Sequence, residues 1–177
     1  PLILFPLLNV EEIAVISREY MNKVQFLFAG GFIIALAIQK WDLHKRVALN
    51  ILKFSGLNSQ GIVASFMVAS AVLSMWVMNT STAIMLLPVG ISVIKVINDT
   101  VNDITDNQKF NFQLCLLLGI AYAASVGGIA TPIGTSPNGV LIQFASNNYD
   151  YDIGFANWIS IGLPITLGLG PIIWIFL

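Results

Sequence analysis

The sequence predicts an all-α polytopic membrane protein, and composition and charge pattern are the two observations behind this. Hydrophobic residues make up 56% of the 177 residues and charged residues 10%, whereas soluble domains carry about 25% charged residues. Three runs, 54–94, 110–149 and 153–177, contain no Asp, Glu, Lys or Arg. A spanning helix needs roughly 20 apolar residues, so each of the first two runs holds more than one simple helix. The net charge of −1 gives no reason to expect a nucleic-acid partner.

Residues 1–60 are expected to form spanning helices and one helix in the membrane interface. Residues 2–8 are apolar and should end one spanning helix, residues 9–23 should be a polar connection, and residues 24–39 should form a second span. In that span Gly30 and Gly31 would allow close helix contact. Residues 40–53 carry four of the eight basic residues among apolar side chains, which is typical of an amphipathic helix at the cytoplasmic interface. The apolar sequence at both chain ends indicates a fragment cut at both ends.

Residues 61–97 are predicted to form a helical hairpin that re-enters the membrane. Two apolar arms, 61–77 and 80–97, flank the polar stretch MNTST. Lipid-exposed backbone must be hydrogen-bonded within its own helix, so an interruption at this depth has to be shielded by protein or to line a wet cavity. We expect the first arm to end near Val77–Met78, and the second to start with Thr80 or Thr82 as its N-cap.

Residues 110–146 are predicted to form a broken helix, and residues 153–177 a further span. The stretch GGIATPIGTSPN, residues 127–138, contains five glycines and prolines in twelve residues and cannot lie in lipid as a plain helix. Gly127 and Gly128 should end the first half, with glycine accepting the left-handed conformation. Ser136 should be the N-cap of the second half, with Pro137 at its first helical position.

Each interruption would present a carbonyl end and an N–H end, which attract a cation and an anion respectively. Broken helices of this kind near the midplane are typical of ion-coupled secondary transporters. Neither interruption contains an acidic or basic residue, which favours cation coupling over proton coupling, provided the rest of the protein supplies no acid. The alternative is continuous helices in which hydroxyls bond to their own backbone and glycines help packing. The neutral groups suited to Na⁺ and to carboxylate oxygens are Asn79, Thr80, Ser81, Thr82, Thr131, Thr135, Ser136 and Asn138.

Three stretches resemble the divalent anion/sodium symporter family, which carries di- and tricarboxylates or sulfate. They are FLFAGGFIIALAIQKWDLHKRVAL, MNTSTAIMLLP and ASVGGIATPIGTSPN, and the resemblance extends over nearly all of the chain. It implies the N-terminal half of a transporter built from two inverted repeats, each with one re-entrant hairpin and one broken helix. It further implies a homodimer held by a scaffold that includes residues 1–60, with residues 61–177 in a transport region that moves like an elevator.

The resemblance also implies the residues of the site. The Asn and Thr of the hairpin signature correspond to Asn79 and Thr80. The signature Ser is Met78 here, and because a thioether is a poor Na⁺ ligand, one side-chain oxygen is lost. Either Ser81 or a backbone carbonyl replaces that oxygen, or coupling at this site is weaker. The substrate-binding residues implied are Asn79, Thr80, Thr135 and Asn138. The residues implied to hold Na⁺ are Ser74, Asn79, Gly127, Gly128, Thr131 and Gly134.

The preferred hypothesis is a Na⁺-coupled symporter of succinate-like di- or tricarboxylates, embedded in the cell (inner or plasma) membrane. A sulfate or proton-coupled permease of the same architecture is a close alternative, because sulfate and carboxylate oxygens accept hydrogen bonds from similar hydroxyl and N–H donors. A channel with a re-entrant pore loop is a third possibility. An enzyme is not expected: an intramembrane serine protease needs a Ser-His or Ser-Lys pair at membrane depth, and His44 and every lysine lie outside the uncharged runs.

Overall fold

The computed structural model describes residues 2–20, 23–52, 58–100 and 105–177, and the regular structure in these ranges is entirely α-helical. The predicted all-α class is therefore confirmed for the described part of the chain. The helices are α1 (Leu4–Leu7), α2 (Ile13–Tyr20), α3 (Lys23–Lys40), α4 (Leu43–Leu52), α5 (Ser59–Ser74), α6 (Asn79–Thr100), α7 (Asp106–Gly127), α8 (Ser136–Tyr149) and α9 (Phe155–Phe176).

In the described part of the chain, three helices are long and apolar enough to cross a membrane: residues 79–99 of α6, α7 and α9. Large apolar side chains cover their outer surfaces; on α9, for example, Ile161 is 65% and Ile175 73% exposed. Water-exposed surfaces rarely carry so many contiguous apolar groups, whereas a bilayer accepts them. Length and surface together support the predicted membrane class.

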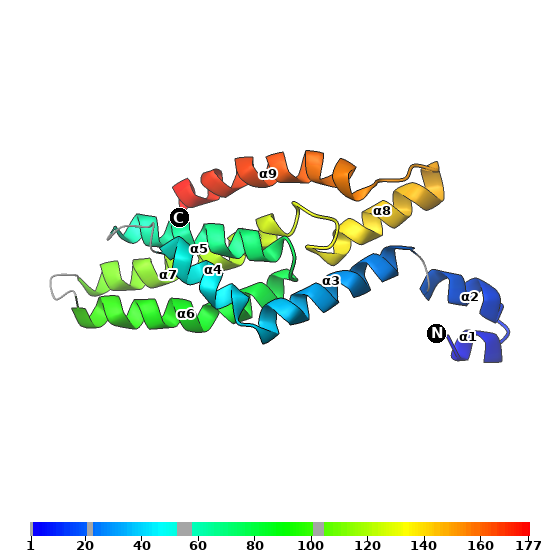
Figure 1. Cartoon of the computed structure of the whole chain (residues 1–177), viewed down its shortest axis with the longest axis horizontal. Coiled ribbons are helices and arrows are strands. Elements are labelled where there is room, and N and C mark those ends of the chain that lie inside the picture. The colour runs from blue at the N-terminus through cyan, green and yellow to red at the C-terminus, as the bar shows by residue number, and fades with distance from the viewer. Residues whose placement is uncertain (1, 21–22, 53–57, 101–104) are drawn as a thin grey trace.

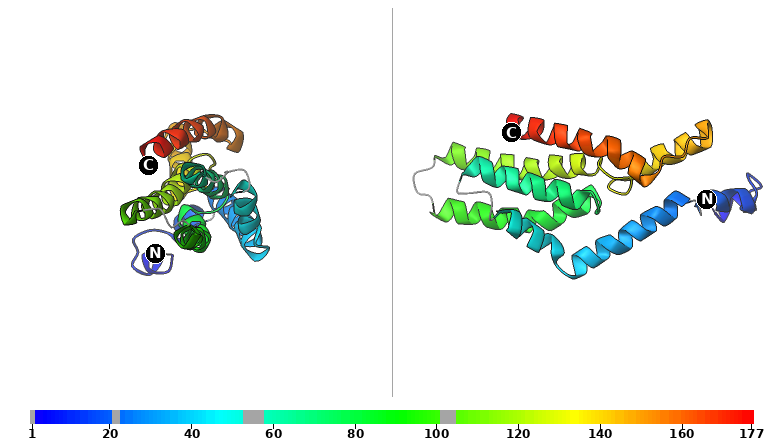
Figure 2. Two further views of the ribbon diagram at one scale, coloured as in Figure 1. Left: turned by 90° about the vertical axis from the view of Figure 1, so that its left-hand side faces the viewer. Right: turned by 45° about the horizontal axis from the view of Figure 1, so that its top comes forward.

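Helices α5, α6, α7 and α9 lie side by side in a bundle, and α3 extends away from it beside α8 (Figures 1 and 2). The core of this bundle is built around Phe66, Leu86 and Leu116, which are at most 1% exposed and come from α5, α6 and α7 in turn. Helices α5 and α6 run antiparallel, and α7 returns along both of them (Figure 1). This packing brings residues 75–78 and residues 128–135 to the same end of the bundle.

The N-terminal region differs from the prediction in one respect. Residues 9–23 contain the helix α2 rather than only a polar connection. Apolar side chains recur there at helical spacing, at Ile13, Ile16 and Tyr20, and Ile16 is buried. The predicted helices at 24–39 and within 40–53 are present as α3 and α4. Gly31 packs against Ile133, where an added methyl group would lie 3.3 Å from the side chain, but Gly30 faces open space.

Candidate functional site

Thr131 connects two segments that join helices. One is residues 75–78, between α5 and α6, and the other is residues 128–135, between α7 and α8. The hydroxyl of Thr131 donates a hydrogen bond to the backbone carbonyl of Met75 and accepts one from the N–H of Gly134 at 3.1 Å. Thr131 is only 3% exposed. A buried hydroxyl is costly unless it is hydrogen-bonded, and here both its donor and its acceptor functions are used. Thr131 therefore fixes the two connecting segments against each other.

A second contact joins the end of α5 to the start of α6. The hydroxyl of Ser74, the last residue of α5, donates to Oδ1 of Asn79, the first residue of α6, at 2.7 Å. Ser74 is completely buried. Oδ1 of Asn79 also lies so close to Gly128 that a methyl group on that glycine would overlap it. Ser74, Asn79 and Gly128 therefore meet at one point.

This region needs glycine at several positions, because atoms of neighbouring segments lie too close to leave room for a side chain. A methyl group on Gly127 would overlap the backbone of Ala71 in α5. A methyl group on Gly134 would overlap the carbonyl oxygen of Gly128 and lie 2.9 Å from that of Ser74. Helix α7 ends at Gly127 as predicted, but the left-handed conformation expected there is wrong, because Gly128 has φ −61° and ψ −20°. The absence of a side chain, and not a special backbone conformation, is what these positions need.

Two predicted helix starts are also corrected. Helix α5 ends at Ser74, before Val77, and α6 begins at Asn79, so neither Thr80 nor Thr82 is its N-cap. The hydroxyl of Thr82 instead donates back to the carbonyl of Val77 at 3.3 Å from inside the first turn. Helix α8 begins at Ser136 with Thr135 as the N-cap, one residue earlier than predicted, and Pro137 lies in its first turn.

Asn138 holds the connection between α7 and α8 together. Its side-chain nitrogen donates to the carbonyl oxygens of Gly128 and Thr131, both at 2.8 Å, and the residue is 7% exposed. The carbonyl of Thr131 also accepts the N–H of Gly134 at 3.3 Å. A carbonyl oxygen has two lone pairs, so that of Gly128, which accepts from Asn138, can still take a further partner. The amide thereby orients the backbone oxygens around Gly134.

The arrangement gathers neutral oxygens at one place. The carbonyl oxygens of Ser74 and Gly128 flank Gly134, and Oδ1 of Asn79 lies against Gly128. Carbonyl, amide and hydroxyl oxygens can replace the hydration shell of a hard cation, as they do in ion-selective pores. Within the described residues, no group of three or more His, Cys, Asp or Glu side chains is placed to hold a metal ion. The donor set fits an alkali cation such as Na⁺.

Not every residue expected at the site is enclosed. Thr80 is exposed on the first turn of α6, and Thr135 is half-buried. Met78, which replaces the expected serine, is 40% exposed, and its carbonyl accepts the N–H of Thr82 at 2.9 Å. Ser81 is half-buried. The structure thus brings together Ser74, Asn79, Gly127, Gly128, Thr131, Gly134 and Asn138, with Thr80 and Thr135 at more accessible positions.

Sequence reasoning missed three residues of α9 that contact this region. Trp158 Nε1 donates to the carbonyl of Ile129 at 2.9 Å, and the hydroxyl of Thr166 donates to the carbonyl of Val126 at 3.0 Å. Between them, a methyl group on Gly162 would lie 3.2 Å from Cα of Ala130. The spacing of four residues was a usable signal, since it places a tryptophan, a glycine and a threonine on one side of a largely apolar helix.

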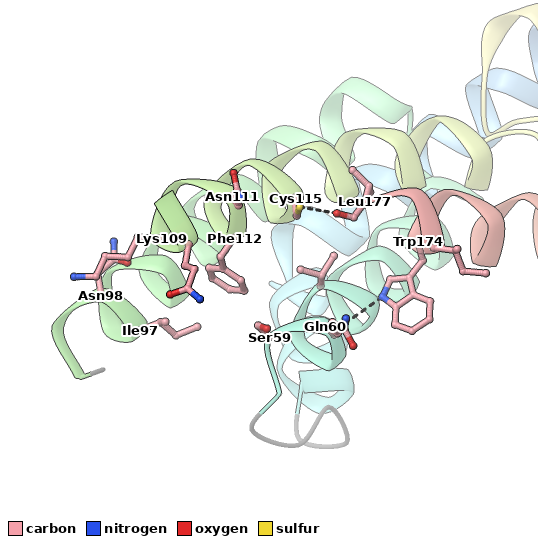
Figure 3. A pocket seen from close by; sticks show the side chains of 13 residues that line it. Ser59, Gln60, Ile97, Asn98, Lys109, Asn111, Phe112, Cys115, Trp174 and Leu177 are labelled. Atoms are coloured by element: carbon pink, nitrogen blue, oxygen red, sulfur yellow. Dashed lines mark hydrogen bonds between the residues drawn. The ribbon is translucent and has the colours of Figure 1, made fainter. Parts of the chain in front are cut away.

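A hollow of about 740 Å³ lies at the other end of the bundle (Figure 3). It is lined by the ends of α5, α6, α7 and α9, including Gln60, Asn98 and Lys109. Trp174 Nε1 donates there to the carbonyl of Gln60 at 3.2 Å, and the thiol of Cys115 to the carbonyl of Leu177 at 2.9 Å. None of the predicted site residues lines this hollow.

Comparison with known proteins gives two findings. Residues 1–177 match a protein family described as citrate transporter. The chain is also 38% identical, over a 178-residue alignment, to proteins named sodium-dependent dicarboxylate transporter SdcS from Staphylococcus aureus strains USA300, NCTC 8325 / PS 47 and COL. Each alignment covers all of this chain and 34% of the relative, so the chain spans about a third of the length of the curated relatives it matches.

Proposed function

Because the chain belongs to the citrate transporter family, we propose that it forms part of a secondary active transporter that couples Na⁺ entry to the uptake of di- or tricarboxylates. The resemblance drawn from the three sequence stretches is confirmed by the family match and by the relatives, whose names describe a sodium-dependent dicarboxylate transporter. These names indicate transport and not an enzymatic reaction. The proposed location is the cell (inner or plasma) membrane.

One observation carries the Na⁺ assignment: neutral oxygens from two segments about 50 residues apart converge on Gly128 and Gly134. We assign Na⁺ to Ser74, Asn79, Gly127, Gly128, Thr131 and Gly134. Cation binding by uncharged groups is favourable when rigid neighbours hold the oxygens in place, because the ion then loses its water without further reorganisation of the protein. Ser74, Thr131 and Asn138, all strongly buried, provide that support.

We assign the substrate carboxylate to Asn79, Thr80, Thr135 and Asn138. The accessible positions of Thr80 and Thr135 suit hydroxyls that donate to an incoming anion. Asn138 differs from them, because its side-chain nitrogen already donates to two carbonyls. A substrate contact through this nitrogen would have to replace one of those bonds. Among the described residues, the side-chain nitrogen of Asn79 has no such bond to replace. A bound Na⁺ beside Asn79 would offset the charge of the anion.

The proposed mechanism is an elevator. Residues 61–177, with α5–α6 as a re-entrant hairpin and α7–α8 as a broken helix, would move as a transport region against a scaffold that includes residues 1–60, in a homodimer. The support is the set of contacts between residues 71–79 and residues 127–134, which makes independent movement of the hairpin and the broken helix costly. Close alternatives are a sulfate or proton-coupled permease of the same architecture and, in another class, a channel with a re-entrant pore loop.

The test is uptake of labelled succinate, citrate and sulfate by the full-length transporter in proteoliposomes. We expect saturable uptake of a di- or tricarboxylate that rises with an inward Na⁺ gradient and is lost when K⁺ replaces Na⁺. The family description makes citrate the second substrate to try. Uptake driven by a pH gradient and indifferent to Na⁺ would reject the coupling. Passive flux that does not saturate would reject the transporter class in favour of a channel.

A further inference from the structure

One side of α9 donates hydrogen bonds to backbone carbonyls at the C-terminal end of α7. Trp158, Gly162 and Thr166 follow each other at intervals of four residues and so share one side of the helix. Trp158 donates to the carbonyl of Ile129 and Thr166 to that of Val126. Gly162 lets the two backbones approach, since a methyl group there would lie within 3.2 Å of Ala130.

These donors bond to carbonyls at the C-terminal end of a helix, where partners within the helix are missing. The last carbonyls of an α-helix have no partner within the helix and must be satisfied from outside. Around the end of α7, the N–H groups of Ile129 and Ala130 turn back to the carbonyls of Val126 and Gly127. Further donors come from two directions: α8 supplies Asn138 to the carbonyl of Gly128, and α9 supplies Trp158 and Thr166. The backbone of residues 126–131 is therefore held from both sides.

The peptide planes explain why this matters for Gly127 and Gly128. The carbonyl of Val126 lies in the peptide plane that precedes Gly127, and the carbonyl of Ile129 lies in the plane that follows Ile129. The two planes between them carry the carbonyls of Gly127 and Gly128. Glycine has the least restricted backbone of any residue, so the direction of these two planes depends on hydrogen bonds. The N–H of Ala130 donates to the carbonyl of Gly127 at 3.1 Å and Asn138 donates to that of Gly128, while Thr166 and Trp158 donate to the carbonyls on either side.

We propose that Thr166 and Trp158 are positioning residues for the cation site: by fixing the carbonyls of Val126 and Ile129 they set the direction of the glycine carbonyls between them. This inference rests on the proposed function. The burial of Thr166, which is 5% exposed in an apolar helix, agrees with it. A threonine within a helix commonly bonds to the preceding turn of its own helix, and this one instead bonds across to α7.

The test compares Thr166→Val, Thr166→Ser and Trp158→Phe in the full-length transporter reconstituted in proteoliposomes. We expect Thr166→Val and Trp158→Phe to raise the half-saturating Na⁺ concentration about three- to tenfold, as for the loss of one hydrogen bond, with maximal uptake at saturating Na⁺ changed less than twofold. Thr166→Ser keeps the donor and should restore the wild-type value. The Na⁺ dependence of the melting temperature in detergent gives a second reading that requires no transport.

The same helix provides matched controls. Trp174 also donates its ring N–H to a backbone carbonyl, but at the other end of the bundle, and Ser160 bonds within α9 to Asn157. Trp174→Phe and Ser160→Ala should leave the half-saturating Na⁺ concentration unchanged. Variants of Thr166 and Trp158 that lose folded protein while the remainder binds Na⁺ as the wild type does would show a packing role and overturn the inference. Wild-type uptake that ignores Na⁺ would instead reject the proposed function.

Discussion

The hydroxyl of Thr131 donates a hydrogen bond to the backbone carbonyl of Met75, 56 residues earlier in the chain. This bond joins the segment between α7 and α8 to the segment between α5 and α6. Both segments lack charge, and both expose backbone groups that the adjoining helices cannot satisfy. The candidate site is therefore formed by both segments together, and neither segment forms it alone.

Replacing Thr131 by Val should destabilise the protein by about 1–3 kcal/mol, because the carbonyl of Met75 and the N–H of Gly134 would each lose a buried partner. Thr131→Ser keeps the hydroxyl and should recover most of that loss. The measurement is thermal unfolding in detergent, followed by tryptophan fluorescence. Equal melting temperatures for the Val and Ser variants would contradict the role assigned to this hydroxyl.

Gly127→Ala should destabilise the protein by about 2 kcal/mol or more, because the methyl group would overlap the backbone of Ala71, which cannot move without shifting α5. Gly168→Ala is the matched control, since nothing lies within 4 Å of the added methyl group. Yield of folded protein and melting temperature measure the difference. If both variants behaved alike, the close packing of α7 on α5 would be in question.

Asn79→Ala should abolish Na⁺-driven uptake without loss of folded protein, since Asn79 is only half-buried and its Oδ1 is an assigned ligand.

Ser74→Ala should raise the half-saturating Na⁺ concentration about tenfold, because it removes one oxygen and the donor that orients Oδ1 of Asn79. Ser92→Ala serves as the control, as this exposed hydroxyl bonds within α6 to Pro88. Unchanged uptake by Asn79→Ala would reject the site.

Met78→Ser should lower the half-saturating Na⁺ concentration about threefold, because it restores the hydroxyl that the resemblance expects at this position. The side chain of Met78 is 40% exposed, so its replacement should change the melting temperature little. Uptake measured over a series of Na⁺ concentrations decides the outcome. A higher half-saturating concentration in the serine variant would show that the methionine itself supports the site.

The sequence was informative wherever a feature is local. The glycines and prolines of residues 127–138 placed the end of α7 correctly at Gly127, because helix breaking depends on the residue itself. Helix α5 ends at Ser74, three residues before the predicted Val77. The apolar residues Met75–Val77 continue the preceding pattern, and the N–H of Val77 still donates to the carbonyl of Leu73 at 3.0 Å, so this boundary leaves little trace in the sequence. Partners such as Thr166 for Val126, 40 residues apart, leave no local trace beyond their spacing.

The neutrality of residues 75–78 and 128–135 has a consequence for acidity. Neither segment contains a side chain that gains or loses a proton near neutral pH. The oxygens that they contribute therefore keep the same charge in acidic and alkaline media. If the proposed substrate is correct, a pH dependence of uptake that arises at these segments would come from the substrate, because the fraction of the carboxylic acid present as the dianion changes with pH.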